Sequence, residues 1–419
     1  MEVAHPLWTL RHRPDSHAVT RLEPMTRLIE DELTRLRAAS GLGPDEGKGI
    51  VVYLHEREEK GGPTRKRAFA SWRDDGEVSA HFLVVADFDD RTELLRSLVA
   101  NELVKASTFA ALRRTPDDHM TAPNSALAWL MEGSGTLLHT GGWFGRDVDA
   151  LTTAFIDGKI DHPVTDILSS DYQKSWTFNP RITHTFNVVE FPELASFTRH
   201  LWSTREPARY TALLRRVREL GDAGALRAFD EVYGAPLPAL EAEWRKQLAS
   251  GSKRDPAIDA PRLGRVVRRY VAVLEVSARA LTLDNAAVAS WSKKYAADIS
   301  VMPLLKLDLD TAEANLSRAH DGLLADLTRA APLVEKGLGV RLQLPVKAGA
   351  KRELVAGPVV VSSVSPGGAG ARRALAKGDE LHLLDSEIHA TLGEPTPGAY
   401  EGVVRVTREG KLVTLAPAR

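Results

Sequence analysis

The stretch Arg91–Leu112, RTELLRSLVANELVKASTFAAL, decides how the rest of the chain is interpreted. Its apolar residues, among them Leu95, Val99 and Ala106, recur at helical spacing and predict one amphipathic helix. Glu102 falls in the middle of this apolar stripe, where a core residue is expected. A lone buried carboxylate is costly unless it is paired, protonated or bound to a metal. The position of Glu102 therefore predicts a specialised site on this helix.

The residues around Glu102 differ at two positions from HExxH, a zinc-binding helix motif; the chain has Asn101-Glu102-Leu103-Val104-Lys105. In HExxH the two His donate imidazole nitrogens to zinc, and the Glu activates the metal-bound water. Here Asn101 offers an amide oxygen, which is a poor zinc donor, and Lys105 has no lone pair while it is protonated. Zinc is therefore not expected, and the sequence predicts no cofactor.

A regular order of elements surrounds this helix. Strands are expected at residues 6–13, 48–55, 67–72 and 78–86, with a long helix at residues 17–40. A second helix is expected over Ser125–His139, with Asn124 as its N-cap. Further helices are expected at Phe197–Ser203, Tyr210–Leu220, Leu226–Val232 and Leu237–Leu248. Residues 250–261 read as a linker, and a helical segment follows whose last member, Asp310–Ala330, is ended by Pro332.

The order of these elements, with the HExxH-like helix and the run Trp129–Leu137 (WLMEGSGTL), resembles the peptidase-MA-like, gluzincin type of zinc metallopeptidase. The segments FPELASFTRHLW and ALRAFDEVYGAPLPALEAEWRKQL are similar to later parts of that family, so the resemblance covers roughly residues 6–248. In the family, a Glu on the second helix is the third zinc ligand, and Glu132 falls on that position. The resemblance implies a relic site made of Asn101, Glu102, Lys105 and Glu132, with no catalytic residue set intact.

Three arrangements of this relic site are open at the level of sequence. In the first, the Lys105 ammonium lies near Glu132, Glu102 or both and replaces the metal electrostatically. In the second, Glu102 and Glu132 face solvent unpaired. In the third, zinc is held by other residues, for which the candidate imidazoles are His81, His119, His139 and His184. Gly133 and Gly135 in the second helix have two explanations, a close helix approach or a bend near the relic site, and ordinary helix packing is the alternative.

The carboxyl-terminal part of the chain resembles a PDZ domain. The matching segments are Lys336–Val340, Val359–Ala369, Ala374–Leu381 and the two final strands at residues 403–408 and 412–415. The resemblance implies a carboxylate-binding loop at Gly337, Leu338, Gly339 and Val340, to which a peptide's C-terminal tail would add as a strand. The second helix of the groove is expected between Ile388 and Val403. Prolines and glycines in that stretch predict a short or absent helix, so a purely structural use of the module is the alternative.

Composition and charge exclude some classes of function. The chain has 419 residues, of which 43% are hydrophobic and 26% charged, as in ordinary globular proteins. A net charge of −1 gives no reason to expect nucleic acid, and no apolar run reaches the ~18–20 residues of a membrane span. The absence of cysteine excludes disulfides and thiolate metal sites. The first residues, MEVAHPLWTL, do not have the pattern of a signal peptide.

These observations predict an α+β protein in three parts. The parts are a metallopeptidase-like domain at residues 1–250, with a mixed sheet and a mostly helical subdomain, a helical connector at residues 251–332, and a PDZ-like β-barrel or sandwich at residues 333–419. The preferred function is that of an inactive peptidase that binds or presents a protein or peptide partner. The alternatives are an active zinc peptidase with Glu102 as general base, and a structural assembly subunit. The resembled families imply a periplasmic or extracellular protein of the bacterial cell envelope if a signal segment was removed, and a cytoplasmic protein otherwise.

Overall fold

The computed structural model describes residues 1–15, 17–40, 48–55, 68–72, 77–83, 92–112, 125–138, 143, 145–170, 186–250, 254–280, 298, 302–347, 352–355, 357–382 and 404–415. These residues divide into two compact units, and the boundary lies between Ala257 and Ile258. Each unit has its own sheet and its own helices. The PDZ-like segment expected from the sequence and the helical connector from Ile258 onward fall within the second unit, whereas the first residues of the expected connector belong to the first unit. Their separation into two domains stays a prediction.

The first unit is built on a five-stranded sheet with the order β1-β2-β3-β5-β4. Its strands are β1 (Glu2–Ala4), β2 (Trp8–His12), β3 (Ile50–His55), β4 (Ala68–Trp72) and β5 (Val78–Leu83). The three central strands β2, β3 and β5 are parallel, while β1 and β4 run antiparallel at the two edges. This is a mixed sheet, as the sequence predicts.

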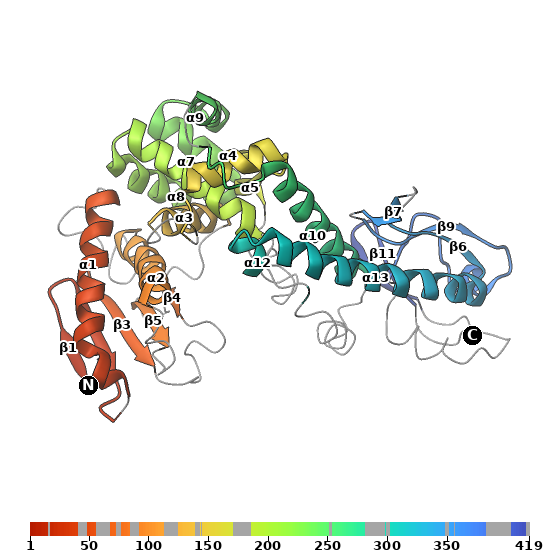
Figure 1. Cartoon of the computed structure of the whole chain (residues 1–419), viewed down its shortest axis with the longest axis horizontal. Helices are drawn as coiled ribbons and strands as arrows, with labels where there is room; N and C mark the ends of the chain where they lie inside the picture. The colour runs from red at the N-terminus through yellow and green to blue at the C-terminus, as the bar shows by residue number, and fades with distance from the viewer. Residues whose placement is uncertain are drawn as a thin grey trace. The chain divides into compact units, whose positions relative to one another are not determined.

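One face of the sheet is buried and apolar because its residues alternate along the strands. In β3, Ile50, Val52 and Leu54 are buried, and the residues between them are only partly buried. The helices α1 (Leu22–Ser40) and α2 (Thr92–Leu112) lie side by side next to the sheet, as Figure 1 shows in red and orange. Their apolar residues share one core with the sheet. A short 3-10 helix at His17–Arg21 replaces the first turn of the helix expected at residues 17–40.

The rest of the first unit is helical. It contains α3 (Ser125–Leu137), α4 (Val148–Gly158), α5 (Val164–Ser169), α7 (Phe186–Thr204), α8 (Pro207–Tyr233) and α9 (Leu237–Ser250). The two helices expected at residues 210–220 and 226–232 are joined as α8, which is interrupted only by Gly221 at φ 65°. Helix α3 lies against α2, α7 and α8, so the site residues on α3 are held from several sides.

Helix α3 approaches α7 so closely that one glycine is required at the contact. A Cβ atom added at Gly133 would lie 2.9 Å from the Leu194 Cβ atom and 3.0 Å from the Leu194 carbonyl oxygen. Of the two explanations for Gly133 in the sequence, close helix approach is therefore confirmed.

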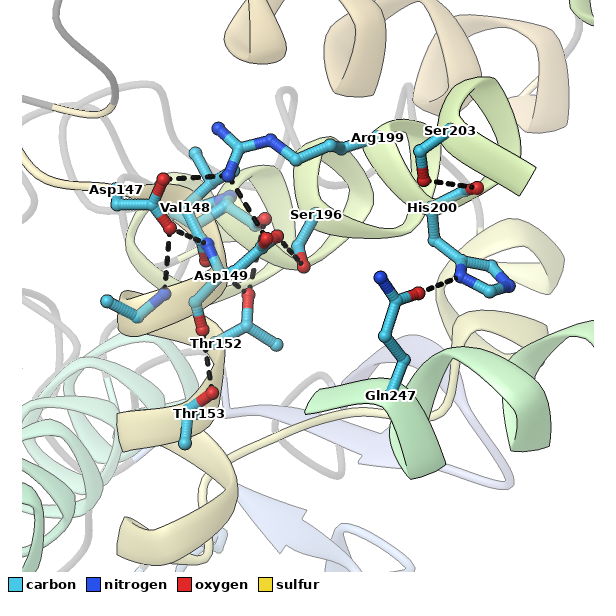
Figure 2. A network of polar contacts seen from close by, with 12 residues as sticks. Asp147, Val148, Asp149, Thr152, Thr153, Ser196, Arg199, His200, Ser203 and Gln247 are labelled. Carbon is cyan, nitrogen blue, oxygen red and sulfur yellow. Dashed lines mark hydrogen bonds and ion pairs between the residues drawn. The ribbon is translucent and has the colours of Figure 1, made fainter. Parts of the chain in front are cut away.

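A polar network ties α4 to α7, and Figure 2 shows its geometry. The side chain of Asp147 caps α4 by accepting hydrogen bonds from the backbone N–H groups of Asp149 and Ala150. The Arg199 guanidinium lies 2.7 Å from Asp147 Oδ2 and 3.1 Å from Asp149 Oδ2. The Ser196 hydroxyl donates to Asp149 Oδ1 at 2.7 Å. The buried carboxylate of Asp149 is therefore paired with a cation and hydrogen-bonded.

The second unit combines two long helices with an antiparallel sheet. The long helices are α10 (Ala260–Ala280) and α13 (Leu309–Leu338), and the short helices are α12 (Met302–Leu305) and α14 (Ala369–Arg372). The five-stranded sheet has the order β12-β11-β10-β9-β6, and β7 (Val346–Lys347) pairs separately with β8 (Glu353–Leu354). The strands of the larger sheet are β6 (Val340–Gln343), β9 (Val360–Val364), β10 (Glu380–Leu381), β11 (Val404–Arg408) and β12 (Lys411–Leu415). Helices α10 and α13 pack against each other.

The prediction that Pro332 ends the preceding helix is wrong. Helix α13 continues through Pro332 to Leu338, and its left-handed C-cap is Gly339 at φ 66°. Proline removes one helical N–H donor, but the buried stripe continues at helical spacing through Ala331, Val334 and Leu338. Packing of this stripe therefore outweighs the cost of the internal proline.

The strands β9, β11 and β12 fall in segments where the PDZ-like resemblance predicts strands, whereas β7 and β8 were not predicted. A strand, a turn and a short helix follow one another at β9 and α14, and the two final strands pair as β11 and β12. The expected second helix between Ile388 and Val403 lies outside the described residues. The molecule is thus an α+β protein, as predicted. No described helix has the length and apolar character needed to cross a membrane.

Candidate functional site

The candidate site is an ion cluster formed by Glu102, Lys105 and Glu132, named here the Lys105 cluster. Glu102 and Lys105 come from α2, and Glu132 comes from α3. The Lys105 Nζ atom lies 2.8 Å from Glu132 Oε1 and 3.6 Å from Glu102 Oε1. The sequence-based expectation that the Lys105 ammonium lies beside both acids is confirmed as geometry.

All three side chains of the Lys105 cluster are largely removed from solvent. Glu102 and Glu132 are each 6% exposed, so the alternative in which they face water unpaired is wrong. Val99 and Ala106, one helical turn to either side of Glu102, are also buried. Glu102 thus lies within the apolar stripe of α2 and faces the core, as the residue spacing predicts.

The electrostatics of the cluster favour a charged lysine. Burial alone would lower the pKa of Lys105, but the charges of Glu102 and Glu132, and hydrogen bonds to both, raise that pKa above its ordinary value. An ammonium group between two carboxylates has no lone pair to donate. The cluster therefore gives Lys105 neither a nucleophilic nor a general-base role.

The residues present do not fit a zinc ion of the HExxH kind. A protonated Lys105 within 2.8 Å of Glu132 occupies the position from which a second imidazole would act. Asn101 lies in α2 as expected, but its side chain is outside the described part of the structure. Among the described residues, no three or more His, Asp or Glu side chains are grouped to hold a metal ion. No catalytic step through a metal follows from this arrangement.

The histidines considered as replacement ligands do not converge on the cluster in the described part of the chain. His81 lies on β5, where its ring contacts His55 Nε2 at 3.0 Å and Ser79 Oγ at 2.9 Å. It also stacks on Tyr53 with ring centroids 4.7 Å apart. His119, His139 and His184 lie outside the described residues.

The predicted carboxylate-binding loop at residues 336–340 is not a loop. Gly337 and Leu338 form the last turn of α13, and Val340 begins β6. The backbone N–H group of Gly339, expected to bind a terminal carboxylate, donates to the Glu335 carbonyl oxygen instead. The segment is not a separate loop because the α13 helix extends beyond Pro332 and uses the glycine as its C-cap. Peptide binding at these residues stays a prediction.

The strand that follows is contacted by the same glutamate. In the described sheet β6 is an edge strand, and the backbone N–H group of its Leu342 donates to Glu335 Oε1 at 2.7 Å. A side-chain carboxylate of the chain itself therefore binds to β6, at the strand to which a peptide was expected to add.

Sequence reasoning missed a second group of buried acids, Glu190 and Glu193 on α7, named here the α7 carboxyl pair. Glu193 is 0% exposed and Glu190 is 7% exposed. Both lie near His162, which belongs to the segment between α4 and α5. The signal available in the sequence was the apolar surrounding of these acids, VVEFPELASF, in which no polar stripe accompanies them.

Comparisons with known proteins leave the family open, because no family model, curated protein or solved structure matches this chain.

Proposed function

We propose that this protein is an inactive relative of zinc metallopeptidases that acts by binding a protein or peptide partner. The observation that carries the proposal is the Lys105 ammonium between Glu102 and Glu132, at the place where the resembled family holds zinc. An internal cation there neutralises the acids that a metal would otherwise neutralise. The scaffold is thereby preserved without its chemistry.

The mixed sheet and the helices α2 and α3 support the metallopeptidase-like part of the proposal. Their order along the chain is the one expected from the resembled family, and the acid of each helix points into the same buried cluster. A site that lacks both imidazole ligands but keeps both acids is the pattern expected of an enzyme that has lost its activity.

Partner binding is the less supported half of the proposal. It follows from the resemblance of the second unit to a PDZ domain and from the edge strand β6. The helical residues 337 and 338 and the contact between Glu335 and Leu342 reduce the support for the particular loop that the sequence suggested. Strand addition along β6 requires that the Glu335 carboxylate leave Leu342.

The first test is metal content and peptidase activity of the purified full-length protein. We expect less than stoichiometric zinc by elemental analysis. We also expect that the rate of casein cleavage is the same in the parent and in Glu102→Gln, so that no cleavage depends on Glu102. Stoichiometric zinc with cleavage that depends on Glu102 would overturn the proposal in favour of an active peptidase.

The second test restores the missing ligands with the double variant Asn101→His, Lys105→His. Two imidazoles one helical turn apart, together with Glu132, form a zinc-binding set. We expect this variant to bind one zinc ion, while the parent and the matched surface variant Lys246→His do not. Failure of a folded double variant to bind zinc would contradict the assignment of this cluster as a relic metal site.

A further inference from the structure

The α7 carboxyl pair lies against the segment that joins α4 to α5. Both carboxylate oxygens of Glu193 accept the backbone N–H of His162, each at 3.2 Å. The His162 Nδ1 atom lies 3.5 Å from Glu190 Oε1 and 4.0 Å from Glu193 Oε2. The second oxygen of Glu190 is buried and has no hydrogen-bond partner among the described residues. This segment is thus held to α7 through two acids and one histidine.

This pair differs from the other buried acids of the described chain in lacking a permanent cation. Each of the others has a Lys or Arg within salt-bridge distance; these acids are Glu32, Glu102, Glu132, Asp149, Glu241 and Asp379. Asp149 lies on α4, which packs against α7, and it is paired with Arg199, as Figure 2 shows. For Glu190 and Glu193, the basic side chain within salt-bridge distance is His162.

One permanent cation, Arg245, acts on the pair from beyond salt-bridge distance, and its charge lowers the pKa of Glu193. Arg245 on α9 lies 2.6 Å from Asp161 and 2.9 Å from Glu241, and its guanidinium also donates to the His162 carbonyl oxygen. Other charged residues on the neighbouring elements include Asp157 with Arg254, Asp149 with Arg199, Asp166, and Lys159 at the C-cap of α4. None of these cations lies within salt-bridge distance of Glu190 or Glu193 in the described structure.

Protons are then the natural means of neutralising the pair. Burial raises the pKa of Glu190 to about 8. Burial raises the pKa of Glu193 well above its ordinary value, and the charge of Glu190 raises it further, although the His162 backbone N–H opposes this. Burial lowers the pKa of His162, against the effect of Asp161 and Asp166. The His162 side chain is 49% exposed, which gives solvent a route to the cluster.

We propose that Glu190, Glu193 and His162 form a proton-operated latch, which holds the segment between α4 and α5 against α7 while a carboxyl group is protonated and releases it when both ionise. With one proton on the pair, Glu193 accepts the His162 backbone N–H and Glu190 stays uncharged in its buried position. With none, two like charges lie three residues apart on one helix without a Lys or Arg at salt-bridge distance in the described structure. Separation of the His162 segment then lets water reach Glu190.

The latch makes stability depend on pH in a defined direction. An unfolded chain gives up the Glu190 proton near the ordinary value of 4.5, whereas the folded chain keeps it to about 8. Between these values the folded state holds more protons, so its stability falls as the pH rises. The stabilisation is complete below the lower value and is lost by the upper one.

The test is urea unfolding of the full chain from about pH 5 to about pH 8, with Glu190→Gln, Glu193→Gln and the half-exposed control Glu243→Gln. For the parent and the control, the Glu190 carboxyl alone is expected to raise the unfolding equilibrium constant by about tenfold per pH unit over this range. Each latch variant is expected to lose part of that rise. Equal pH dependence in the parent and both latch variants would overturn the proposal.

Two measurements on the unmodified protein make the test independent of how well the variants fold. Hydrogen-exchange protection of the His162 N–H, corrected for the intrinsic effect of pH, is expected to fall as the pH rises toward 8. The infrared band of a protonated carboxyl group is expected at neutral pH and absent at high pH. Protection that does not change with pH, or no such band, would contradict the latch. A stabilising effect of added zinc that requires Glu190 would also overturn it, because a metal and not a proton would neutralise the pair.

Discussion

The first unit buries two pairs of acids in different ways. Glu102 and Glu132 share the ammonium of Lys105, whereas the basic side chain within salt-bridge distance of Glu190 and Glu193, among the described residues, is His162. In the first case the neighbouring cation has the raised pKa, and in the second the acids themselves do. A fixed cation makes a buried acid pair independent of pH near neutrality. A pair without one becomes a proton-binding site.

The largest expected effect comes from Lys105→Met, which would leave Glu102 and Glu132, like Glu190 and Glu193, without a permanent cation at salt-bridge distance in the described structure. Removing one partner of a buried ion cluster leaves charge without compensation and costs about 3–5 kcal/mol at neutral pH. The loss should shrink as the pH falls, because the two acids can then take up protons. Urea unfolding at several pH values measures both effects. The exposed Lys246→Met serves as a control, and a pH-independent loss below about 1 kcal/mol would contradict the buried ion cluster.

A smaller effect is expected when the two acids of the Lys105 cluster are compared. Glu132 lies 2.8 Å from the Lys105 Nζ atom, and Glu102 lies 3.6 Å from it. Since a hydrogen bond to a charged group contributes about 1.5–3 kcal/mol, Glu132→Gln should cost about that much. Glu102→Gln should cost less, because its contact with Lys105 is longer. Thermal unfolding of the two variants side by side gives the order, and the reverse order would show that Glu102 holds the ammonium.

The smallest effect is expected at Gly133, which adjoins Glu132 in α3 and contacts Leu194, the neighbour of Glu193. An added methyl group would overlap the Leu194 backbone, which typically costs about 1–3 kcal/mol, while alanine regains about 1 kcal/mol of helix propensity. Gly133→Ala should therefore lose about 1 kcal/mol net. The matched change Gly221→Ala lies in open space but at φ 65°, so it reports backbone strain without overlap. A stabilised Gly133→Ala would mean that α3 and α7 can separate without loss.

The Lys105 cluster could be predicted because its sequence pattern is local and unusual. An acid in the middle of an apolar helical stripe leaves few options, and a lysine three residues later supplied one of them. The partner Glu132 came from the resemblance to a family and not from the spacing. Its position against Lys105 depends on how α2 and α3 pack, which the sequence does not contain.

The α7 carboxyl pair could not be predicted in the same way. Two acids three residues apart on a helix normally indicate a solvated face, whereas here they are buried on α7, which packs against several other helices of the unit. The prediction of where α13 ends was wrong for a related reason. Proline is a strong local signal for a helix end, but the buried residues on both sides of Pro332 hold the helix together.

Glu335 belongs to the chain itself and occupies the junction between α13 and β6. Its carbonyl oxygen closes the helix at Gly339, and its carboxylate takes a main-chain donor of the next strand. Any ligand that competes for that donor must displace a group tethered seven residues away, which is present at high effective concentration. Docking along this strand would therefore be intrinsically weak and quickly reversible.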